Sequence, residues 1–410
     1  MRTTKVRLFR TPADILLLFF ARATRLFAYG FLSVVLALYL DAIGLSKRQI
    51  GLLLTLALIG DALLSFYITT SADRIGRRRM LIAGAVLMAV GGVAFATSTS
   101  AVVLMVVATV GVFSPSGHEV GPFLSIEQAS LSQLVEPSKR THVFARYALT
   151  ASFATALGAL AGGGVAGLLQ RAGVGIAESY RVLLWGYAAF GVVLAVIFLR
   201  LSPRIEAKRA ATIASRFGLH RSRGAVLRLS ALFMMDSFGG GFVIQSLLVL
   251  WFHLRFGFDI ASLGALFFAA NLIAGISALV AARIAARIGL VNTMVVTHLP
   301  SNVLLMAVPL MPTPLLAVTV LLARYTISQM DVPTRQSYTM AIVAPDERSA
   351  AAGITGIARS VGAALSPALS GALMANPALL AVPFYLAGGI KIVYDLLVYR
   401  GFKAHRPPEE

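Results

Sequence analysis

Apolar residues run through the chain in twelve long blocks that short polar segments separate. A helix needs about 20 apolar residues to cross the hydrocarbon core of a bilayer, and each block is about that long or longer. The pattern therefore predicts an all-α integral membrane protein with twelve transmembrane helices. These helices are expected at residues 13–41, 47–72, 79–98, 101–134, 141–170, 180–201, 226–254, 260–286, 290–310, 313–343, 348–375 and 379–400. The fourth contains the sequence SPSG at 114–117, so we expect one broken helix there.

The composition and the distribution of charge agree with a membrane protein. Of the 410 residues, 58% are hydrophobic and 13% are charged, and the net charge is +19. When successive loops are assigned to alternate sides, one side carries 24 Lys and Arg and the other carries five. The positive-inside rule then places both termini in the cytoplasm, in the inner (plasma) membrane of a bacterium-like cell. Topology accounts for the basic excess, so no nucleic-acid partner is expected.

The chain divides into two halves of six predicted helices. A basic cytoplasmic linker at 202–225 separates an N-terminal half, 1–201, from a C-terminal half, 226–410. The segment RIGRRRMLIAG at 74–84 recurs as RIGLVNTMVVT at an offset of 213 residues, and EPSKR at 136–140 recurs as APDER at an offset of 208. An internal duplication is therefore predicted, with two pseudo-symmetric six-helix bundles. This plan is common among transporters, whose substrate path lies near the midplane between the halves.

Two loop motifs and the six-plus-six layout resemble those of the major facilitator superfamily. The sequence DRIGRR at 73–78 lies between the second and third predicted helices, and a degenerate copy begins at Arg287. The second motif, Pro-x-x-Arg, occurs at 137–140 and again at 345–348. The resemblance covers essentially the whole chain. It implies a transporter fold and does not specify the substrate.

The resemblance also implies a conformational latch in the loop at 73–78. Asp73 would lie near one end of the eleventh helix and hold the outward-open state, while the arginines join a charge network on the cytoplasmic face. Ion pairs of this kind can shift a two-state equilibrium by a few kcal/mol. The alternative is that the arginines only set the topology. The latch candidates are Asp73, Arg74, Gly76, Arg77 and Arg78.

One departure from the family pattern lies in the fifth predicted helix. Drug antiporters of the family carry a Gly-rich run with a Gly-Pro pair there, and this chain has GALAGGGVAG at 158–167 without the proline. The departure weakens the assignment to drug antiporters. Small residues still let helix backbones approach closely, so close packing is the simpler interpretation.

Several carboxyl groups fall within the predicted helices. Ionisable side chains are costly in lipid and are usually functional or paired, and a carboxyl group can carry a proton. The proton-coupling candidates are Glu119, Asp236, Asp61, Glu127 and Asp331, of which Glu119 and Asp236 are preferred.

Basic and polar side chains within the helices supply candidates for substrate binding. Arg22, Arg25 and Tyr29 are spaced by three and four residues and therefore share one face of the first helix. Two arginines on one face suit an anionic solute or carboxylates of neighbouring helices, and both interpretations stay open. The remaining substrate-binding candidates are Gln245, Asn271 and Arg324.

Two pairings of these charges are expected. Asp236 falls opposite Arg25 in the alignment of the two halves, at an offset of 211 residues, so the two would meet across the cavity. Lys391 and Asp395 lie four residues apart on one helix and would form a structural pair.

Other kinds of chemistry lack sequence support. The chain has no cysteine, which excludes disulfides and Cys-based metal sites. It has no Gly-rich loop followed by Lys-Ser/Thr, so we do not expect ATP as the energy source. Neither a His-x-x-Glu-His-type metal motif nor a hydrolase nucleophile elbow occurs. We therefore expect neither an enzyme nor a bound cofactor.

These features favour a secondary active transporter that moves a small molecule across the cytoplasmic membrane by alternating access, with proton-coupled efflux as the preferred mode. The first alternative is a proton-coupled importer of a small organic anion, with Arg22, Arg25 and Arg324 as its binding groups. The second is a non-transporting scaffold or sensor on the same fold, against which the many costly buried charges argue. The expected partners are the solute, protons and membrane lipids, and the resemblance implies that a monomer suffices.

Overall fold

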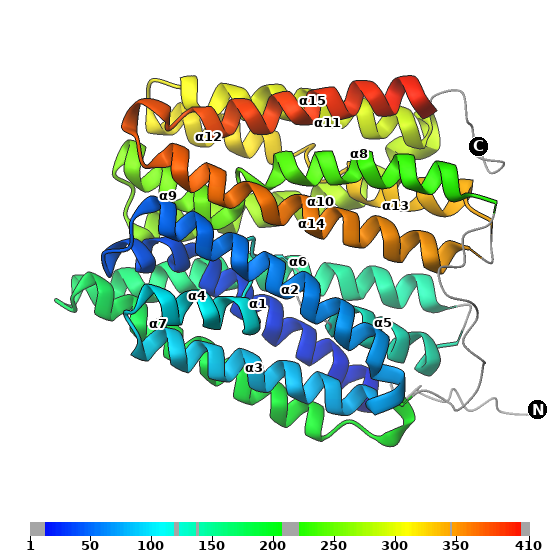
Figure 1. The fold of residues 1–410 in the computed structure, drawn as a ribbon, viewed down its shortest axis with the longest axis horizontal. Helices are drawn as coiled ribbons and strands as arrows, with labels where there is room; N and C mark the ends of the chain where they lie inside the picture. The colour runs from blue at the N-terminus through cyan, green and yellow to red at the C-terminus, as the bar shows by residue number, and fades with distance from the viewer. Residues whose placement is uncertain (1–12, 119–122, 137–138, 207–220, 345–346, 403–410) are drawn as a thin grey trace, which may run out of the picture.

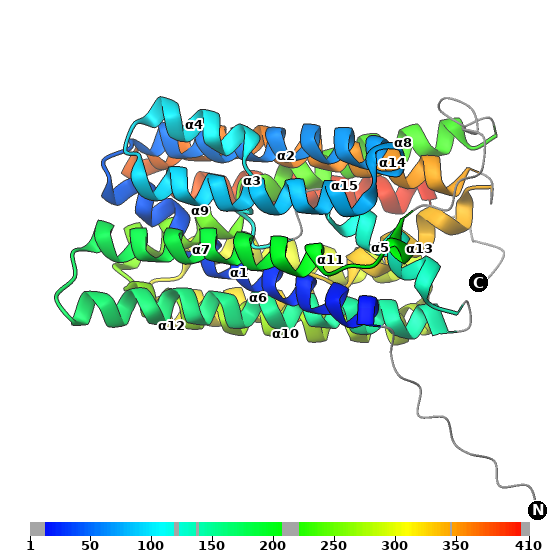
Figure 2. The ribbon, with the colours of Figure 1, turned by 90° about the horizontal axis from the view of Figure 1, so that it is seen from below.

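A computed structural model of the chain describes residues 13–118, 123–136, 139–206, 221–344 and 347–402. These residues form α-helices that run side by side in a bundle (Figures 1 and 2), and this part of the chain contains no β-strand. The helices of the N-terminal half are α1 (Ala13–Ala42), α2 (Lys47–Ile75), α3 (Arg77–Thr97), α4 (Ala101–Val110), α5 (Phe123–Leu134), α6 (Arg140–Arg171) and α7 (Ile176–Leu199), with the 3-10 turn η2 (Pro203–Ile205) after them. Those of the C-terminal half are α8 (Arg223–Gly241), α9 (Gln245–Phe256), α10 (Ile260–Ile288), α11 (Leu290–Ala307), α12 (Pro314–Tyr325), α13 (Asp331–Ile342), α14 (Arg348–Met374) and α15 (Val382–Phe402), with the 3-10 turns η3 (Val308–Leu310) and η4 (Pro377–Leu379).

The predicted helices agree with the structure to within a few residues at their ends. Among the described residues, ten stretches are long and apolar enough to cross a membrane, and the remaining two predicted helices are each split into shorter pieces. Local capping explains several helix starts. At the start of α2, for example, the Ser46 hydroxyl accepts a hydrogen bond from the Gln49 amide, and the Gln49 side chain accepts one from the Ser46 amide. This reciprocal box satisfies two backbone donors that the first turn of a helix leaves open.

Three of the predicted helices are interrupted. The fourth is divided into α4 and α5, as the sequence SPSG at 114–117 predicts, and Gly117 there has a φ of +72°. The seventh is divided into α8 and α9. The tenth was predicted as one continuous helix at 313–343, but the structure divides it into α12 and α13. Pro333 lies in the first turn of α13, where a helix tolerates proline, and its ring would clash with the preceding turn of a continuous helix.

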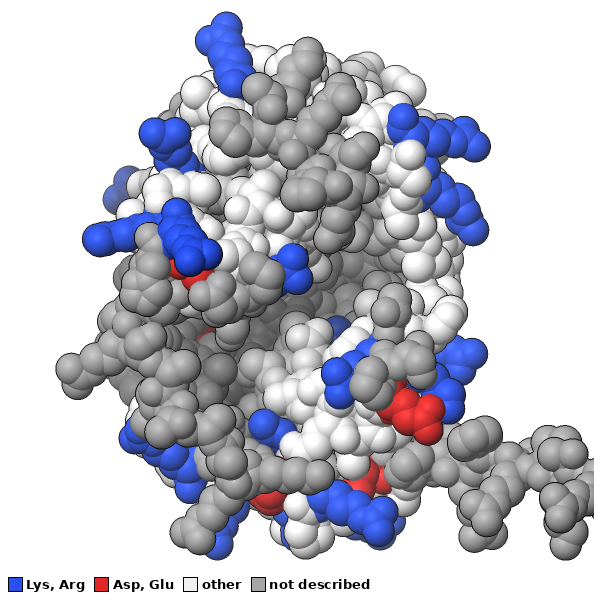
Figure 3. All heavy atoms as spheres, turned by 90° about the vertical axis from the view of Figure 1, so that its right-hand side faces the viewer, with Lys and Arg blue, Asp and Glu red and all other residues white. Residues whose placement is uncertain are grey.

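Lys and Arg side chains of both halves gather at one end of the bundle. We call the end at which α1 begins and α15 ends the basic end, and the other the far end. Figure 3 views the molecule from the basic end and shows Lys and Arg side chains around a rim with a hollow at the centre. Arg77, Arg140, Arg223 and Arg348 each begin a helix at this end. The distribution of charge predicts that the hollow faces the cytoplasm.

At the far end, the two halves pack closely through pairs of glycines. A methyl group on Gly163 of α6 would lie 2.6 Å from the Cα atom of Gly264 on α10, and one on Gly371 of α14 would lie 2.4 Å from the carbonyl oxygen of Lys47 on α2. The Gly-rich run at 158–167 therefore serves close packing, as its composition predicts. The conformation is closed at the far end and open toward the basic end.

Candidate functional site

The first candidate site is a buried ion pair in the N-terminal half, here called the N-terminal network (Arg22, Arg25, Glu127 and Tyr147). Arg25 on α1 donates two hydrogen bonds to Glu127 on α5, from Nη1 to Oε1 at 2.6 Å and from Nη2 to Oε2 at 2.8 Å. Both side chains are 0% exposed. The Tyr147 hydroxyl on α6 also donates to Glu127 Oε2, and Arg22 Nε donates to the Tyr147 carbonyl oxygen at 2.9 Å. The positive charge of Arg25 therefore compensates the negative charge of Glu127.

Aromatic rings cover both guanidinium groups of this network. The Cζ atom of Arg25 lies 4.6 Å from the centre of the Phe123 ring, and that of Arg22 lies 4.3 Å from the centre of the Tyr147 ring. Cation–π contacts of this kind contribute about 2 kcal/mol when they are shielded from water. The rings thus keep water from the ion pair, which binds the helices of the N-terminal half to one another.

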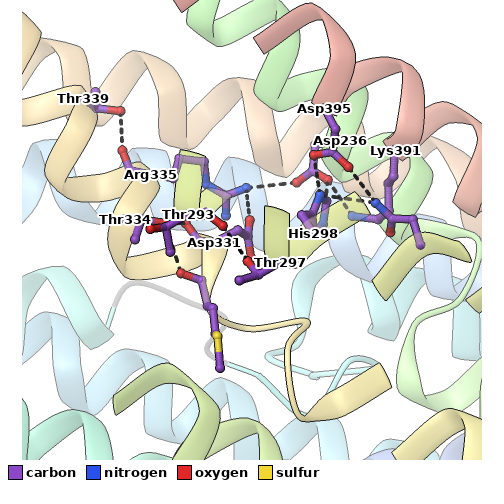
Figure 4. Close-up of polar contacts among 12 residues, drawn as sticks. Asp236, Thr293, Thr297, His298, Asp331, Thr334, Arg335, Thr339, Lys391 and Asp395 are labelled. Carbon is purple, nitrogen blue, oxygen red and sulfur yellow. Dashed lines mark hydrogen bonds and ion pairs between the residues drawn. The ribbon is translucent and has the colours of Figure 1, made fainter. Parts of the chain in front are cut away.

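The second candidate site surrounds Asp236 in the C-terminal half (Figure 4). Lys391 Nζ on α15 lies 2.6 Å from Asp236 Oδ1, and Arg335 Nη1 on α13 lies 3.0 Å from Asp236 Oδ2. The same Arg335 nitrogen lies 3.0 Å from Asp331 Oδ2, one turn earlier on α13. All four side chains are buried. Asp236 therefore ties α8 to two other helices of its half.

A histidine extends this cluster to a second aspartate. His298 Nδ1 on α11 lies 2.8 Å from Asp395 Oδ1, and its Nε2 lies 3.7 Å from Asp236 Oδ1. Asn302, one turn further along α11, donates to Asp395 Oδ2 at 3.0 Å. Figure 4 shows His298 close to Asp236 and Asp395, and its two ring nitrogens each face one of these carboxyl groups. We call these seven residues the C-terminal network: Asp236, His298, Asn302, Asp331, Arg335, Lys391 and Asp395.

The glycines at the end of α8 make room for this network. A methyl group on Gly239 would lie 3.1 Å from the Cγ atom of Lys391, and one on Gly240 would lie 3.6 Å from its Cε and Nζ atoms. The aliphatic part of Lys391 can therefore lie along the backbone of α8, which lets its ammonium group reach Asp236. The next glycine, Gly241, packs against Ser366 of α14.

The two networks occupy equivalent places in the two halves, but with reversed charges. Arg25 on α1 pairs with Glu127 on α5, while Asp236 on α8 pairs with Arg335 on α13. Asp236 follows Arg25 by 211 residues and Arg335 follows Glu127 by 208, offsets close to those of the repeated loop segments. The base is on the first helix of the N-terminal half, whereas the acid is on the first helix of the C-terminal half.

A set of polar contacts joins the halves on the far-end side of these networks. Gln245 Nε2 on α9 donates to Ser33 Oγ on α1 at 2.7 Å, and Ser246 Oγ donates to the Ser33 carbonyl oxygen at 2.8 Å. The Ser246 amide donates to the Pro115 carbonyl oxygen at 3.0 Å, and Asn271 Nδ2 donates to Gln245 Oε1 at 3.1 Å. In this conformation, the predicted substrate ligands Gln245 and Asn271 therefore help to close the far end.

The comparison with known proteins agrees with this architecture. Residues 18–330 match the sequence model of the Major Facilitator Superfamily. The chain belongs to that superfamily. It is 30% identical to the Saccharomyces cerevisiae protein "Uncharacterized membrane protein YJR124C" over 417 aligned positions, which cover 94% of this chain and 93% of the yeast protein.

Solved transporter structures share the fold of this Major Facilitator Superfamily chain. The D323A mutant of the nucleoside transporter NupG superposes with a TM-score of 0.76 at 14% identity, covering 95% of this chain and 99% of NupG. A bacterial homologue of the human lysosomal transporter Spinster, in its inward-facing and unoccupied conformation, superposes with a TM-score of 0.70 at 16% identity, covering 94% of each chain. The fold and family support secondary transport of a small molecule.

The superfamily's loop motif is held by contacts with the N-terminal half and with Glu206 at the start of the predicted linker. The backbone amides of Arg77 and Arg78 donate to the carboxylate of Glu206 at 2.7 and 3.2 Å. Negative charge at the start of a helix is favourable, so Glu206 caps α3. The Arg77 side chain donates to Gln133 Oε1 on α5 at 3.3 Å, and the Arg78 side chain donates to carbonyl oxygens at the end of α7.

The other latch candidates lie at the turn between α2 and α3. Gly76 has a φ of +116°, a conformation that side chains disfavour, and this turn directs the first amides of α3 toward Glu206. The Arg74 side chain is exposed. The Asp73 side chain lies outside the part of the chain that the structure describes, so its latch role stays a prediction.

The remaining predicted residues are dispersed. Tyr29 is fully buried on α1. Asp61 on α2 is half-buried and accepts a hydrogen bond from the Ser65 hydroxyl at 3.4 Å. Arg324 is half-buried at the end of α12, with its guanidinium 5.3 Å from the Tyr325 ring. Glu119 lies outside the described residues.

Two predicted pairings are wrong. Arg25 and Asp236 do not meet across the cavity, because Asp236 is bound by cations of its own half. Lys391 and Asp395 do not pair, because α15 packs against both α8 and α11 and its successive turns face different neighbours. Lys391 thus reaches Asp236 on α8, while Asp395 accepts from His298 on α11.

Sequence reasoning overlooked His298, Asn302 and Glu206. His298 and Asn302 lie four residues apart in the predominantly apolar stretch at 290–310. This spacing places both on one helix face, a signal that could have identified them. Glu206 carries no such signal, because its partners are backbone amides of a distant loop.

Proposed function

We propose that the chain is a proton-coupled secondary transporter that exports a small molecule across the cytoplasmic membrane by alternating access. The C-terminal network is the observation that carries this proposal. It buries three carboxyl groups, two basic side chains and a histidine within a membrane bundle, where such groups are costly and usually functional.

The arrangement of the network suits a protonation-dependent switch. Asp236 holds together α8, α13 and α15 through two ion pairs. A change of protonation beside it would alter which cation each carboxylate binds and, with that, the relative stability of two helix arrangements. Ion pairs that differ between two conformers can shift their populations by a few kcal/mol.

The export direction is supported by the family-like loop motif at 73–78, and the hollow at the basic end would admit a cytoplasmic solute. The predicted proton-coupling residues Glu119, Asp61, Glu127 and Asp331 remain candidates beside Asp236. Of these, Asp331 belongs to the same network through Arg335.

The proposal is tested with purified protein in proteoliposomes that contain a pH-sensitive dye. A proton gradient is imposed, and cationic, neutral and anionic solutes are screened for solute-dependent proton movement. An exchanger accumulates a labelled solute in the more acidic compartment, whereas a symporter accumulates it in the more alkaline one. The expected result is accumulation on the acidic side.

Variants connect this result to the network. Asp236→Asn is expected to lower solute-linked proton movement roughly tenfold or more. The matched control is Asp259→Asn, because Asp259 is an exposed helix cap at the far end and Asn caps helices equally well. Proton movement that no solute triggers, or an Asp236→Asn variant equal to wild type, would refute the coupling proposal.

A second candidate function is the proton-coupled import of a small organic anion. The Nε atoms of Arg324 and Arg359 are buried and have no hydrogen-bond partner in the described part of the chain. A guanidinium nitrogen without a hydrogen-bond partner suits a carboxylate or phosphate ligand. This function predicts accumulation of an anionic solute on the alkaline side and a raised KM in Arg324→Gln and Arg359→Gln, but not in Arg255→Gln at the exposed far end.

The third function class is a scaffold or sensor that changes conformation without moving solute. Solute-independent conformational exchange, with no transport of any member of the panel, would favour it.

A further inference from the structure

We propose that His298 is the group that takes up the coupling proton, and that Asp395 and Asp236 are the carboxylates that hold it. This assignment rests on the proposed proton-coupled function and names the residue through which the C-terminal network would perform it. Sequence reasoning placed the proton on carboxyl groups. The geometry around the imidazole points to His298 instead.

The first argument is the hydrogen bonding of the ring. His298 Nδ1 lies 2.8 Å from Asp395 Oδ1 and 3.3 Å from Asn302 Nδ2, which also donates to Asp395 Oδ2. The shorter contact is to a carboxylate, which only accepts hydrogen bonds when it is ionised. We therefore assign the ring hydrogen to Nδ1, and in the neutral ring Nε2 is then an unprotonated acceptor. This acceptor lies 3.7 Å from Asp236 Oδ1, which is also an acceptor. Protonation at Nε2 converts this contact between two acceptors into a charge-assisted hydrogen bond.

The second argument is the competition for one oxygen. Asp236 Oδ1 receives Lys391 Nζ at 2.6 Å and faces His298 Nε2 at 3.7 Å. A charge-assisted N–H···O bond is about 2.8 Å long, so the imidazolium must approach by roughly 1 Å. As it does so, it weakens the hold of Lys391 on that oxygen. The step forms one N–H bond with a proton from water and replaces one hydrogen bond to Asp236 with another.

The third argument concerns the groups that face the ring. The His298 ring faces Asp236 of α8, and the Asp331–Arg335 pair of α13 contacts Asp236 from its other oxygen. Helix α15 contributes Lys391 and Asp395. It also contributes Tyr394, whose ring centre lies 5.9 Å from that of His298. No charged side chain of α10 or α12, which also pack on α11, contacts His298 in the described part of the chain. Both carboxylate oxygens of Asp236 already receive a hydrogen bond from a cation, whereas Nε2 of the imidazole faces Asp236 Oδ1 across 3.7 Å without a donor between them.

The consequence reaches the far end through α8. Lys391 links α15 to α8, and α9 continues α8 toward the contacts of Gln245 and Ser246 with the N-terminal half. Release of Lys391 from Asp236 would loosen α8 from α15. The loosened helix α8 is followed directly by α9, whose Gln245 and Ser246 hold the two halves together at the far end.

The test compares His298→Asn with wild type in the proteoliposome assay. The Asn amide replaces the Nδ1–H donor to Asp395 but has no group that titrates. The matched control is His253→Asn, because His253 is exposed at the end of α9 and bonds only to a backbone carbonyl in the described structure. We expect the ratio of protons to solute to fall roughly tenfold or more in His298→Asn and to stay unchanged in the control.

A pH profile supplies the second readout. Solute-linked flux in wild type should change across a series of pH values, and His298→Asn, which has no imidazole at this position, should lose that change. A wild-type ratio and a wild-type pH profile in His298→Asn would overturn the assignment to His298 and leave proton coupling intact. Absence of solute-linked proton movement in wild type would instead overturn the proposed function.

If His298→Asn shows no solute-linked proton movement, exchange of labelled for unlabelled solute without a proton gradient decides the matter, because this exchange needs alternating access but no net proton transfer. Exchange should persist in His298→Asn and in His253→Asn. Loss of exchange in a His298→Asn variant that keeps the wild-type Tm would also overturn the assignment.

Discussion

The buried pair of Arg25 and Glu127 allows a quantitative test of how the N-terminal half is held together. Glu127→Gln is nearly isosteric but removes the negative charge. The amide nitrogen that it introduces would face donors, either the Arg25 guanidinium or the Tyr147 hydroxyl, both of which bond to Glu127 in the native protein. Arg25 would remain in place as a buried cation with one acceptor fewer.

The magnitude follows from the burial of the pair. Both side chains are 0% exposed, and removal of one partner from a buried ion pair costs about 3–5 kcal/mol, because the other charge is left uncompensated. A unit of about 150–250 residues, the size of one half, loses roughly 2–4 °C of Tm per kcal/mol. Glu127→Gln should therefore lower the Tm by roughly 6–20 °C.

The assay is thermal unfolding of the purified protein in detergent, with Glu178→Gln as the matched control. Glu178 pairs with Arg181 at 2.9 Å, but its side chain is 59% exposed, so its loss should cost less than about 1 kcal/mol. Joint replacement of Arg25 by Met and Glu127 by Leu should cost less than the sum of the single replacements. If Glu127→Gln melts within the range of the control, the pair does not hold the half together and the reasoning fails.

Three further predictions concern the far end and the loop motif. Gly163→Val should drive α6 and α10 apart and shift the population away from the far-end-closed state. Distances between spin labels on introduced cysteines would measure this shift. The control Gly164→Val should cause no shift, because its side chain meets open space. Gln245→Ala should produce a smaller shift in the same direction, because it removes side-chain contacts but adds no clash. Glu206→Ala should lower the Tm by several °C through loss of about 1–2 kcal/mol of capping at α3, and full retention of the wild-type Tm would contradict that role.

Hydropathy predicted the fold because the bilayer fixes the length of each helix. The break at 114–117 was predicted because Pro115 and Gly117 are strong helix interrupters. The break between α12 and α13 was not predicted from the sequence. The polar stretch at 326–334 is short, and an i,i+4 pair such as Asp331 and Arg335 also fits a continuous helix.

The residues of the site were easier to predict than their partners. Arg25, Glu127, Asp236 and Asp331 stood out because charges are rare in apolar blocks. The partner of each charge depends on how the helices are rotated and which neighbours they meet, which periodicity within one helix does not determine. His298 was overlooked although Asn302 follows it by four residues, because a shared helix face does not show whether that face meets lipid, a packed core or carboxylates.

The reversed charges of the two networks suggest a division of labour between the halves. In the N-terminal network, Arg25 and Glu127 satisfy each other with two direct hydrogen bonds, and aromatic rings cover the guanidinium groups. In the C-terminal network, Asp236 is shared by two cations and faces the open nitrogen of His298. A pair that is joined by two direct hydrogen bonds has little room to change partners, whereas a carboxylate shared by two cations beside an open acceptor can exchange one of them. We therefore expect the N-terminal half to act as the stable body and the C-terminal half to carry the proton-dependent rearrangement.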